Sequence, residues 1–117
     1  MQTGGIAAQE LGKNERYHIY IGLNDREKLK QLCSTEDFIK IVSAICKDYR
    51  IAFSLHEQKG GYMLADGTFV VENSLDLSIV GLKRQEIFQL AAELRARLNQ
   101  ESILVTCDSP EVFLIAK

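Results

Sequence analysis

The sequence has few of the residues from which metal sites and disulfide frameworks are built. It holds 3 cysteines that form no Cys-x-x-Cys pair and only 2 histidines, so a four-ligand metal site would have to be assembled from distant parts of the chain. No apolar run approaches the roughly 20 residues that span a bilayer. An odd cysteine count and the absence of an export signal favour a reducing compartment. We therefore expect no metal, no membrane association and a cytoplasmic location.

The chain also lacks an excess of charge of either sign. Its 14 Lys and Arg residues nearly balance 16 Asp and Glu residues, which leaves a net charge of −2. Non-specific binding to nucleic acid depends on clustered basic side chains that neutralise phosphates, so a nucleic-acid partner is not expected. Neither of the glycine-rich phosphate motifs, G-x-G-x-x-G and G-x-x-x-x-G-K-[ST], occurs. No cofactor is predicted on these grounds.

What the sequence does contain is a long alternating segment, T-F-V-V-E-N-S-L-D-L-S-I-V, at residues 68–80. Alternation predicts a strand with one packed and one solvated face, because successive side chains point to opposite sides of the sheet. Asn73 is the one polar interruption of the apolar row. The apolar row is Phe69, Val71, Leu75, Leu77 and Ile79, and the other row is Val70, Glu72, Ser74, Asp76, Ser78 and Val80. A half-solvated sheet favours antiparallel pairing.

Two helices and further strands are predicted around this segment. The first helix starts after Ser34, which opens a capping-box sequence, and the second carries its apolar residues at helical spacing. Gly60 and Gly61 are expected to break or bulge the strand before the Asp66-Gly67 hairpin turn. In chain order the predicted elements are strand 17–23, helix 35–49, strand 51–56 resumed at 62–65, strand 68–80, helix 84–98, strand 102–107 and a short edge strand 112–116.

The order β-α-β-β-α-β predicts an α+β protein with a ferredoxin-like fold. In that fold two helices pack on one face of an antiparallel sheet, and a short C-terminal strand is added here. With 117 residues the chain fits one domain. We expect this domain to occupy residues 16–117. Residues 1–15 are predicted to form a flexible N-terminal tail, or alternatively a short helix that orders against a partner.

Four short motifs, in this order, resemble a family of small bacterial domains of unknown function. They are Gly22-Leu23 at the end of the first strand, Gly61-Tyr62 at mid-chain, Glu72-Asn73-Ser74 on the next strand, and N-Q-E-S-I-L at residues 99–104. The family pattern ends in a Gln-Glu-Ser-Val-Leu strand, and Tyr62 stands where an aromatic such as Trp is usual. The resemblance implies a ferredoxin-like fold and leaves the activity open.

A polar cluster supplies the candidate binding residues. Its members are Tyr20, His56, Tyr62, Glu72, Asn73, Ser74, Gln100 and Glu101. One interpretation is a surface that orients a ligand or a protein partner. The other is a solvated strand face and a helix-to-strand turn in which Asn99 caps the helix. No catalytic residue is assigned, because no spacing demands a paired carboxylate or a Cys–His arrangement.

Two functions follow from these observations. The leading hypothesis is a non-catalytic interaction or regulatory module that uses an exposed sheet face or edge, binds a protein partner or forms a homodimer, and is encoded by a phage or mobile element as an inhibitor, such as an anti-CRISPR protein. The rival is a small-molecule binder or enzyme with a pocket between the sheet and the hairpin of residues 60–67. Tyr20, His56, Tyr62, Glu72 and Gln100 would line that pocket.

Overall fold

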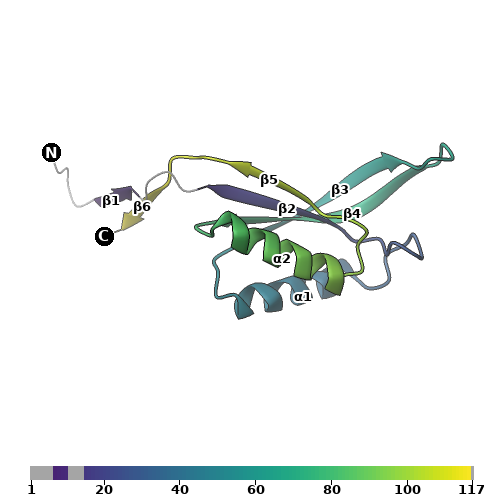
Figure 1. The fold of residues 1–117 in the computed structure, drawn as a ribbon, viewed down its shortest axis with the longest axis horizontal. Coiled ribbons are helices and arrows are strands. Elements are labelled where there is room, and N and C mark those ends of the chain that lie inside the picture. The colour runs from purple at the N-terminus through teal and green to yellow at the C-terminus, as the bar shows by residue number, and fades with distance from the viewer. Residues whose placement is uncertain (1–6, 11–14, 117) are drawn as a thin grey trace.

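The structure is a computed structural model that describes residues 7–10 and 15–116. A four-stranded antiparallel sheet is covered on one face by two helices (Figure 1). The strands lie in the order β3-β4-β2-β5. The elements of this layer are β2 (Arg16–Gly22), α1 (Thr35–Asp48), β3 (Ser54–Met63), β4 (Phe69–Val80), α2 (Arg84–Arg97) and β5 (Leu104–Asp108). The predicted α+β, ferredoxin-like fold is confirmed.

Both helices begin where side chains satisfy the free N–H groups of the first turn. The Ser34 hydroxyl accepts a 3.0 Å hydrogen bond from the Asp37 N–H at the start of α1, as its capping-box sequence predicts. At the start of α2, the Glu86 carboxylate accepts a 3.1 Å bond from the Lys83 N–H. Each helix then buries one apolar stripe against the sheet. These stripes are Phe38, Val42, Ile45 and Cys46 in α1, and Ile87, Leu90, Ala91 and Leu94 in α2.

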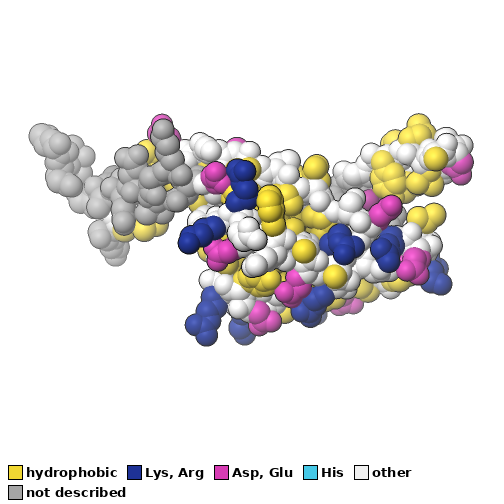
Figure 2. Space-filling view, in the orientation of Figure 1, with side chains coloured by type: hydrophobic (Ala, Val, Ile, Leu, Met, Phe, Trp, Pro, Cys, Tyr) yellow, Lys and Arg dark blue, Asp and Glu magenta, His cyan; other side chains and the backbone are white. Residues whose placement is uncertain are grey.

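The alternation of β4 places its apolar row on the helix-facing side, but only part of that row is covered. Leu75 and Leu77 are fully buried between the sheet and the helices. Phe69 and Val71 lie on the same face, yet 62% and 58% of their surfaces are exposed. The reason is visible in Figure 1, where the β3–β4 hairpin extends past the ends of both helices. Figure 2 shows hydrophobic side chains gathered at the free end of this hairpin.

The predicted break in β3 is wrong. Gly60 pairs with Glu72 and Gly61 with Val71 in an unbroken register from Ser54 to Met63. The strand tolerates the two glycines because its partner, β4, is regular over the whole length. The Phe69 ring also packs over Gly61, where a Cβ atom would lie 2.7 Å from a ring carbon. The glycine therefore admits an aromatic ring and creates no bulge.

The short C-terminal strand lies apart from the main sheet. β6 (Phe113–Ala116) pairs with β1 (Ala7–Glu10) in a separate antiparallel ribbon. This position differs from the edge strand predicted at residues 112–116, and the pairing strand β1 lies in a segment for which no strand is predicted. The partner strand comes from the opposite end of the chain, so no local sequence pattern predicts the pairing. Residues 1–6 and 11–14 of the predicted tail lie outside the described residues. Among the helices that the structure describes, none has the length and apolarity needed to cross a membrane.

Candidate functional site

A cavity of about 320 Å³ lies where three segments meet at one end of the sheet. The segments are the β3–β4 hairpin, the loop that follows β2, and the connection from α2 to β5. Four of the eight residues predicted from the sequence line it, namely Tyr62, Glu72, Gln100 and Glu101. The other lining residues are Asn24, Asp25, Arg26, Leu29, Leu64 and Ser102. We call this space the site cavity.

Glu72 is a carboxylate that the fold holds in place at the site cavity. It projects from the open face of β4 and lies over Gly22 of β2, where a Cβ atom would come within 2.5 Å of Oε1. Its Oε2 accepts a 3.0 Å hydrogen bond from the Asn24 N–H. The side chain is half-buried. A carboxylate in this position can accept hydrogen bonds from a ligand or interact with a positive charge on it.

Gln100, in the connection from α2 to β5, lines the site cavity on the side opposite Glu72. It is one of the few buried polar residues, with 7% of its surface exposed. Its Nε2 donates hydrogen bonds to the backbone oxygens of Asn24, at 2.8 Å, and Leu98, at 3.4 Å. Asn99 adopts a left-handed conformation, with φ of 49°, at the end of α2, in agreement with its predicted capping role. That turn brings Gln100 against the loop after β2.

The carboxylate of Asp25 orders the loop after β2, and Asp25 is not among the residues predicted from the sequence. Asp25 accepts hydrogen bonds of 3.0 Å from the backbone N–H groups of Glu27 and Lys28, and one of 2.7 Å from the Asn99 side-chain amide. The bond from the Lys28 N–H, followed by that from Asn99, lowers the pKa of Asp25 from its ordinary value. The available signal was the Asn-Asp pair directly after a strand, which is typical of side-chain-capped turns.

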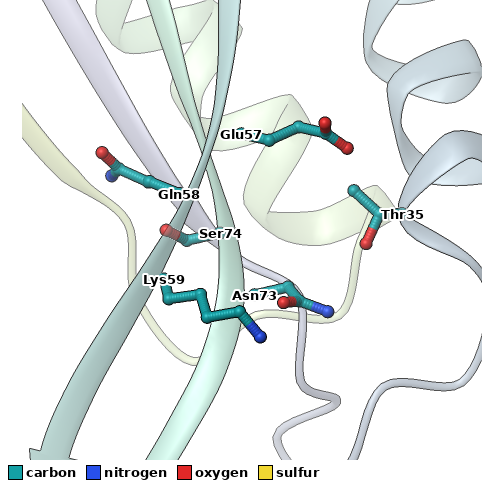
Figure 3. A pocket seen from close by; sticks show the side chains of 6 residues that line it. All are labelled: Thr35, Glu57, Gln58, Lys59, Asn73 and Ser74. Atoms are coloured by element: carbon teal, nitrogen blue, oxygen red, sulfur yellow. The ribbon is translucent and has the colours of Figure 1, made fainter.

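Asn73 does not share the site cavity with Glu72, because adjacent strand residues point to opposite faces. It lines a second cavity of about 270 Å³ (Figure 3). In Figure 3 the side chains of Glu57, Lys59 and Asn73 point toward Thr35, whereas Gln58 and Ser74 point away from it. Asn73 donates a 2.8 Å hydrogen bond to Gln31. Its contact in the structure therefore anchors the end of the loop after β2.

The remaining predicted residues lie on the open sheet face. The Tyr20 ring stacks on His18, with 5.8 Å between ring centroids, and His18 Nδ1 lies 2.9 Å from the Asp76 carboxylate. His56 is exposed on β3 and pairs with Asp76 in register. Ser74 is 8% exposed in the same sheet. None of Tyr20, His56 and Ser74 lines the site cavity. Within the part of the chain that the structure describes, no three His, Cys, Asp or Glu residues are grouped as metal ligands.

Comparison with solved structures gives matches that span nearly the whole chain at appreciable identity. A phage SAM lyase in complex with S-methyl-5'-thioadenosine is 28% identical, with a TM-score of 0.68, over 92% of this chain and 91% of that chain. This chain resembles a phage enzyme. The same coverage and identity hold for a phage SAM lyase in the apo state, with a TM-score of 0.64.

A third structure is similar in fold alone. CutA from Synechococcus elongatus PCC7942 is 12% identical, with a TM-score of 0.59, over 90% of this chain and 83% of that chain. No protein-family model and no curated protein matches the chain. The resemblance to a bacterial family of unknown function therefore stays a prediction.

Proposed function

We propose that this chain binds S-adenosylmethionine (SAM) in the site cavity and cleaves it, with S-methyl-5'-thioadenosine as one product. The observation that carries the proposal is the similarity to a SAM lyase bound to that nucleoside, over 92% of the chain at 28% identity. The size of the site cavity supports it. About 320 Å³ lies near the lower end of the roughly 300–1,000 Å³ typical of small-molecule pockets, which suits a nucleoside.

The reaction balances within the substrate itself. The bond between the sulfonium sulfur and the γ-carbon of the amino-acid arm breaks, and its electron pair stays on sulfur, so the thioadenosine leaves as a neutral thioether. As this bond breaks, the substrate's own carboxylate oxygen attacks the γ-carbon from the side opposite the sulfur and forms a lactone. Alternatively the β-carbon loses a proton to a base and an alkene forms. The first route needs only a folded substrate conformation, and a site supplies that by orientation.

The cavity residues have separate roles in this proposal. The Tyr62 ring offers a face on which the adenine stacks. Glu72 and Glu101 place carboxylates near the positive sulfonium. Because the charge on sulfur disappears as the bond breaks, these carboxylates stabilise the bound substrate more than the transition state. Their loss should therefore raise the KM for SAM without lowering kcat.

This proposal joins the two hypotheses that the sequence left open. The rival hypothesis, a small-molecule enzyme with a pocket at the hairpin, is the one that the phage lyases support. Both lyases are phage proteins, which also supports a phage origin for this chain. An enzyme that removes SAM would act as an inhibitor of SAM-dependent reactions without binding a partner protein. The anti-CRISPR version stays a prediction.

The test is to incubate the purified chain with SAM and follow the products by chromatography and mass spectrometry. We expect S-methyl-5'-thioadenosine to accumulate well above the rate without protein, and the second product to be the lactone or the alkene. Glu72→Gln, which keeps the side-chain shape, should require more SAM for the same rate. Gln89→Glu, an exposed change on α2, is the control and should behave as wild type. Product formation no faster than in buffer would contradict the proposal.

The exposed hairpin favours a second proposal, that copies of the chain associate through it. Met63, Phe69 and Val71 are 63%, 62% and 58% exposed along one face of the hairpin. Contiguous apolar surface of this kind marks contact sites more often than solvated surface. We expect an oligomer by light scattering, and Phe69→Ser should shift it toward the monomer. Phe88→Ser, an equally apolar and exposed change on α2, should leave the oligomer intact.

A further inference from the structure

The site cavity contains a buried amide side chain whose main contact is a single backbone group. Only 7% of the Gln100 surface is exposed, and its Nε2 donates a 2.8 Å hydrogen bond to the carbonyl oxygen of Asn24. The backbone of Gln100 is itself held at the end of α2. Its N–H donates to the Arg95 carbonyl at 3.0 Å, and its carbonyl accepts from the Arg95 guanidinium at 3.3 Å. The side-chain amide of Gln100 therefore extends from a backbone that is itself held by two hydrogen bonds.

Asn24 makes a second contact that leads to the centre of the site. Its N–H donates the 3.0 Å hydrogen bond to Glu72 Oε2. The two backbone groups of one residue therefore join Gln100 on one side to Glu72 on the other. Because the carbonyl bond restricts the orientation of Asn24, it also restricts the direction of the N–H that the carboxylate accepts.

Two neighbouring bonds dock the same loop but do not involve Asn24. The Asn99 side-chain amide donates to Asp25 at 2.7 Å, and the Arg26 N–H donates to the Asn99 carbonyl at 3.4 Å. These contacts hold the loop against the α2–β5 connection as a unit. Among the described side chains, Gln100 and Glu72 hydrogen-bond to Asn24 itself, Gln100 to its carbonyl and Glu72 to its N–H.

We propose that Gln100 is a positioning residue for Glu72, and that it acts through the backbone of Asn24. The proposal deepens the proposed function, since it rests on Glu72 as the carboxylate that contacts SAM. A glutamine is required because the contact needs an N–H donor at the end of a two-methylene arm. Glutamate has the same length but would place an oxygen against the Asn24 carbonyl, and asparagine would end one methylene short.

The experiment is a double-mutant cycle on kcat/KM for SAM, with Gln100→Glu, Glu72→Gln and the double variant. Gln100→Glu alone should lower kcat/KM roughly tenfold, with most of the effect in KM, as for Glu72→Gln. In the Glu72→Gln background the same change should alter kcat/KM by less than about twofold, because the carboxylate to be positioned is gone. Gln89→Glu, the same chemical change at an exposed position, should have no effect. Fully additive losses would overturn the proposal.

A second measurement does not depend on turnover. In the folded protein we expect Gln100→Glu to shift the NMR signals of the Asn24 amide and of the Glu72 carboxyl carbon, and to leave those of β3 residues remote from the cavity unchanged. Gln100→Met, which keeps the length and removes the donor, should produce the same two shifts if Gln100→Glu fails to fold. If wild type does not cleave SAM, the proposed function fails. The NMR signals of Asn24 and Glu72 would still show whether Gln100 positions Glu72. An unmoved Glu72 signal in either folded variant would refute that positioning role.

Discussion

The carboxylate of Glu72 occupies the space in which a side chain at position 22 would begin. An added Cβ atom on Gly22 would lie 2.5 Å from Oε1, 2.8 Å from Cδ and 2.9 Å from Oε2 of Glu72. All three distances are below the closest approach that a Cβ atom normally makes. The glycine at the end of β2 is therefore what allows the carboxylate to reach the Asn24 N–H.

We therefore predict that Gly22→Ala weakens ligand binding but leaves the stability of the fold nearly unchanged. The atoms in conflict belong to the end of a flexible side chain, which can swing away, so the free energy of unfolding should change by less than about 1 kcal/mol. The displaced carboxylate should weaken the binding of SAM, whose sulfonium carries the positive charge, about tenfold or more, as measured by the KM for SAM. Gly60→Ala is the matched control, since nothing lies within 4 Å of its added Cβ. Equal KM values of wild type and Gly22→Ala would contradict the prediction.

Truncation of two apolar residues in the same row of β4 should lower the free energy of unfolding by very different amounts. Leu77→Ala should lower the free energy of unfolding by about 2–5 kcal/mol, because Leu77 is fully buried under the helices and its loss leaves a cavity. Val71→Ala, on the same face of the same strand, should cost less than about 1 kcal/mol in the monomer, because Val71 is 58% exposed. Urea denaturation measures both. Comparable costs would mean that the hairpin end is covered in solution.

We expect the Asp25 carboxylate to stabilise the folded protein at neutral pH and to lose this effect in acid. Hydrogen bonds from Lys28 and Asn99 lower its pKa in the folded protein from the ordinary 3.8, so the charged form is favoured by folding. This contribution is present above the ordinary pKa and is lost as the pH falls through the lowered folded-state value. The stability difference between wild type and Asp25→Asn should therefore shrink from about pH 5 to about pH 2, followed by urea titrations. A difference that stays constant over this range would rule out the ionised carboxylate as its source.

The three cysteines should react with a thiol reagent in an order set by burial. Burial raises the pKa of Cys46 to about 11, so at neutral pH its thiol is both inaccessible and protonated. Cys107 is exposed and Cys33 is partly buried. In the native protein we expect iodoacetamide to label Cys107 first and Cys46 only after denaturation, by peptide mass spectrometry. Native labelling of Cys46 at the rate of Cys107 would show that α1 opens readily.

Local sequence patterns were sufficient for most of the fold. The alternation of residues 68–80 and the capping box at Ser34 each depend on neighbouring residues, and both predicted the observed element. The break predicted at Gly60 and Gly61 failed because strand continuity depends on the pairing partner as well as on local flexibility. The ribbon of β1 and β6 was missed for a related reason, since its two strands come from opposite ends of the chain.

By itself the sequence determined which faces of the strands and helices are apolar, because side-chain direction follows from the period of each element. Together with the short motifs at Gly61-Tyr62 and residues 99–104, it gave eight candidate residues, among them Tyr62, Glu72, Gln100 and Glu101. Only the tertiary structure decided that these four share one cavity with the loop after β2, while Tyr20, His56 and Ser74 stay on the open face and Asn73 turns to the other side. The distance between segments far apart in the chain is set by how the loops dock, and that docking rests on bonds such as Gln100 to Asn24, which no local pattern encodes.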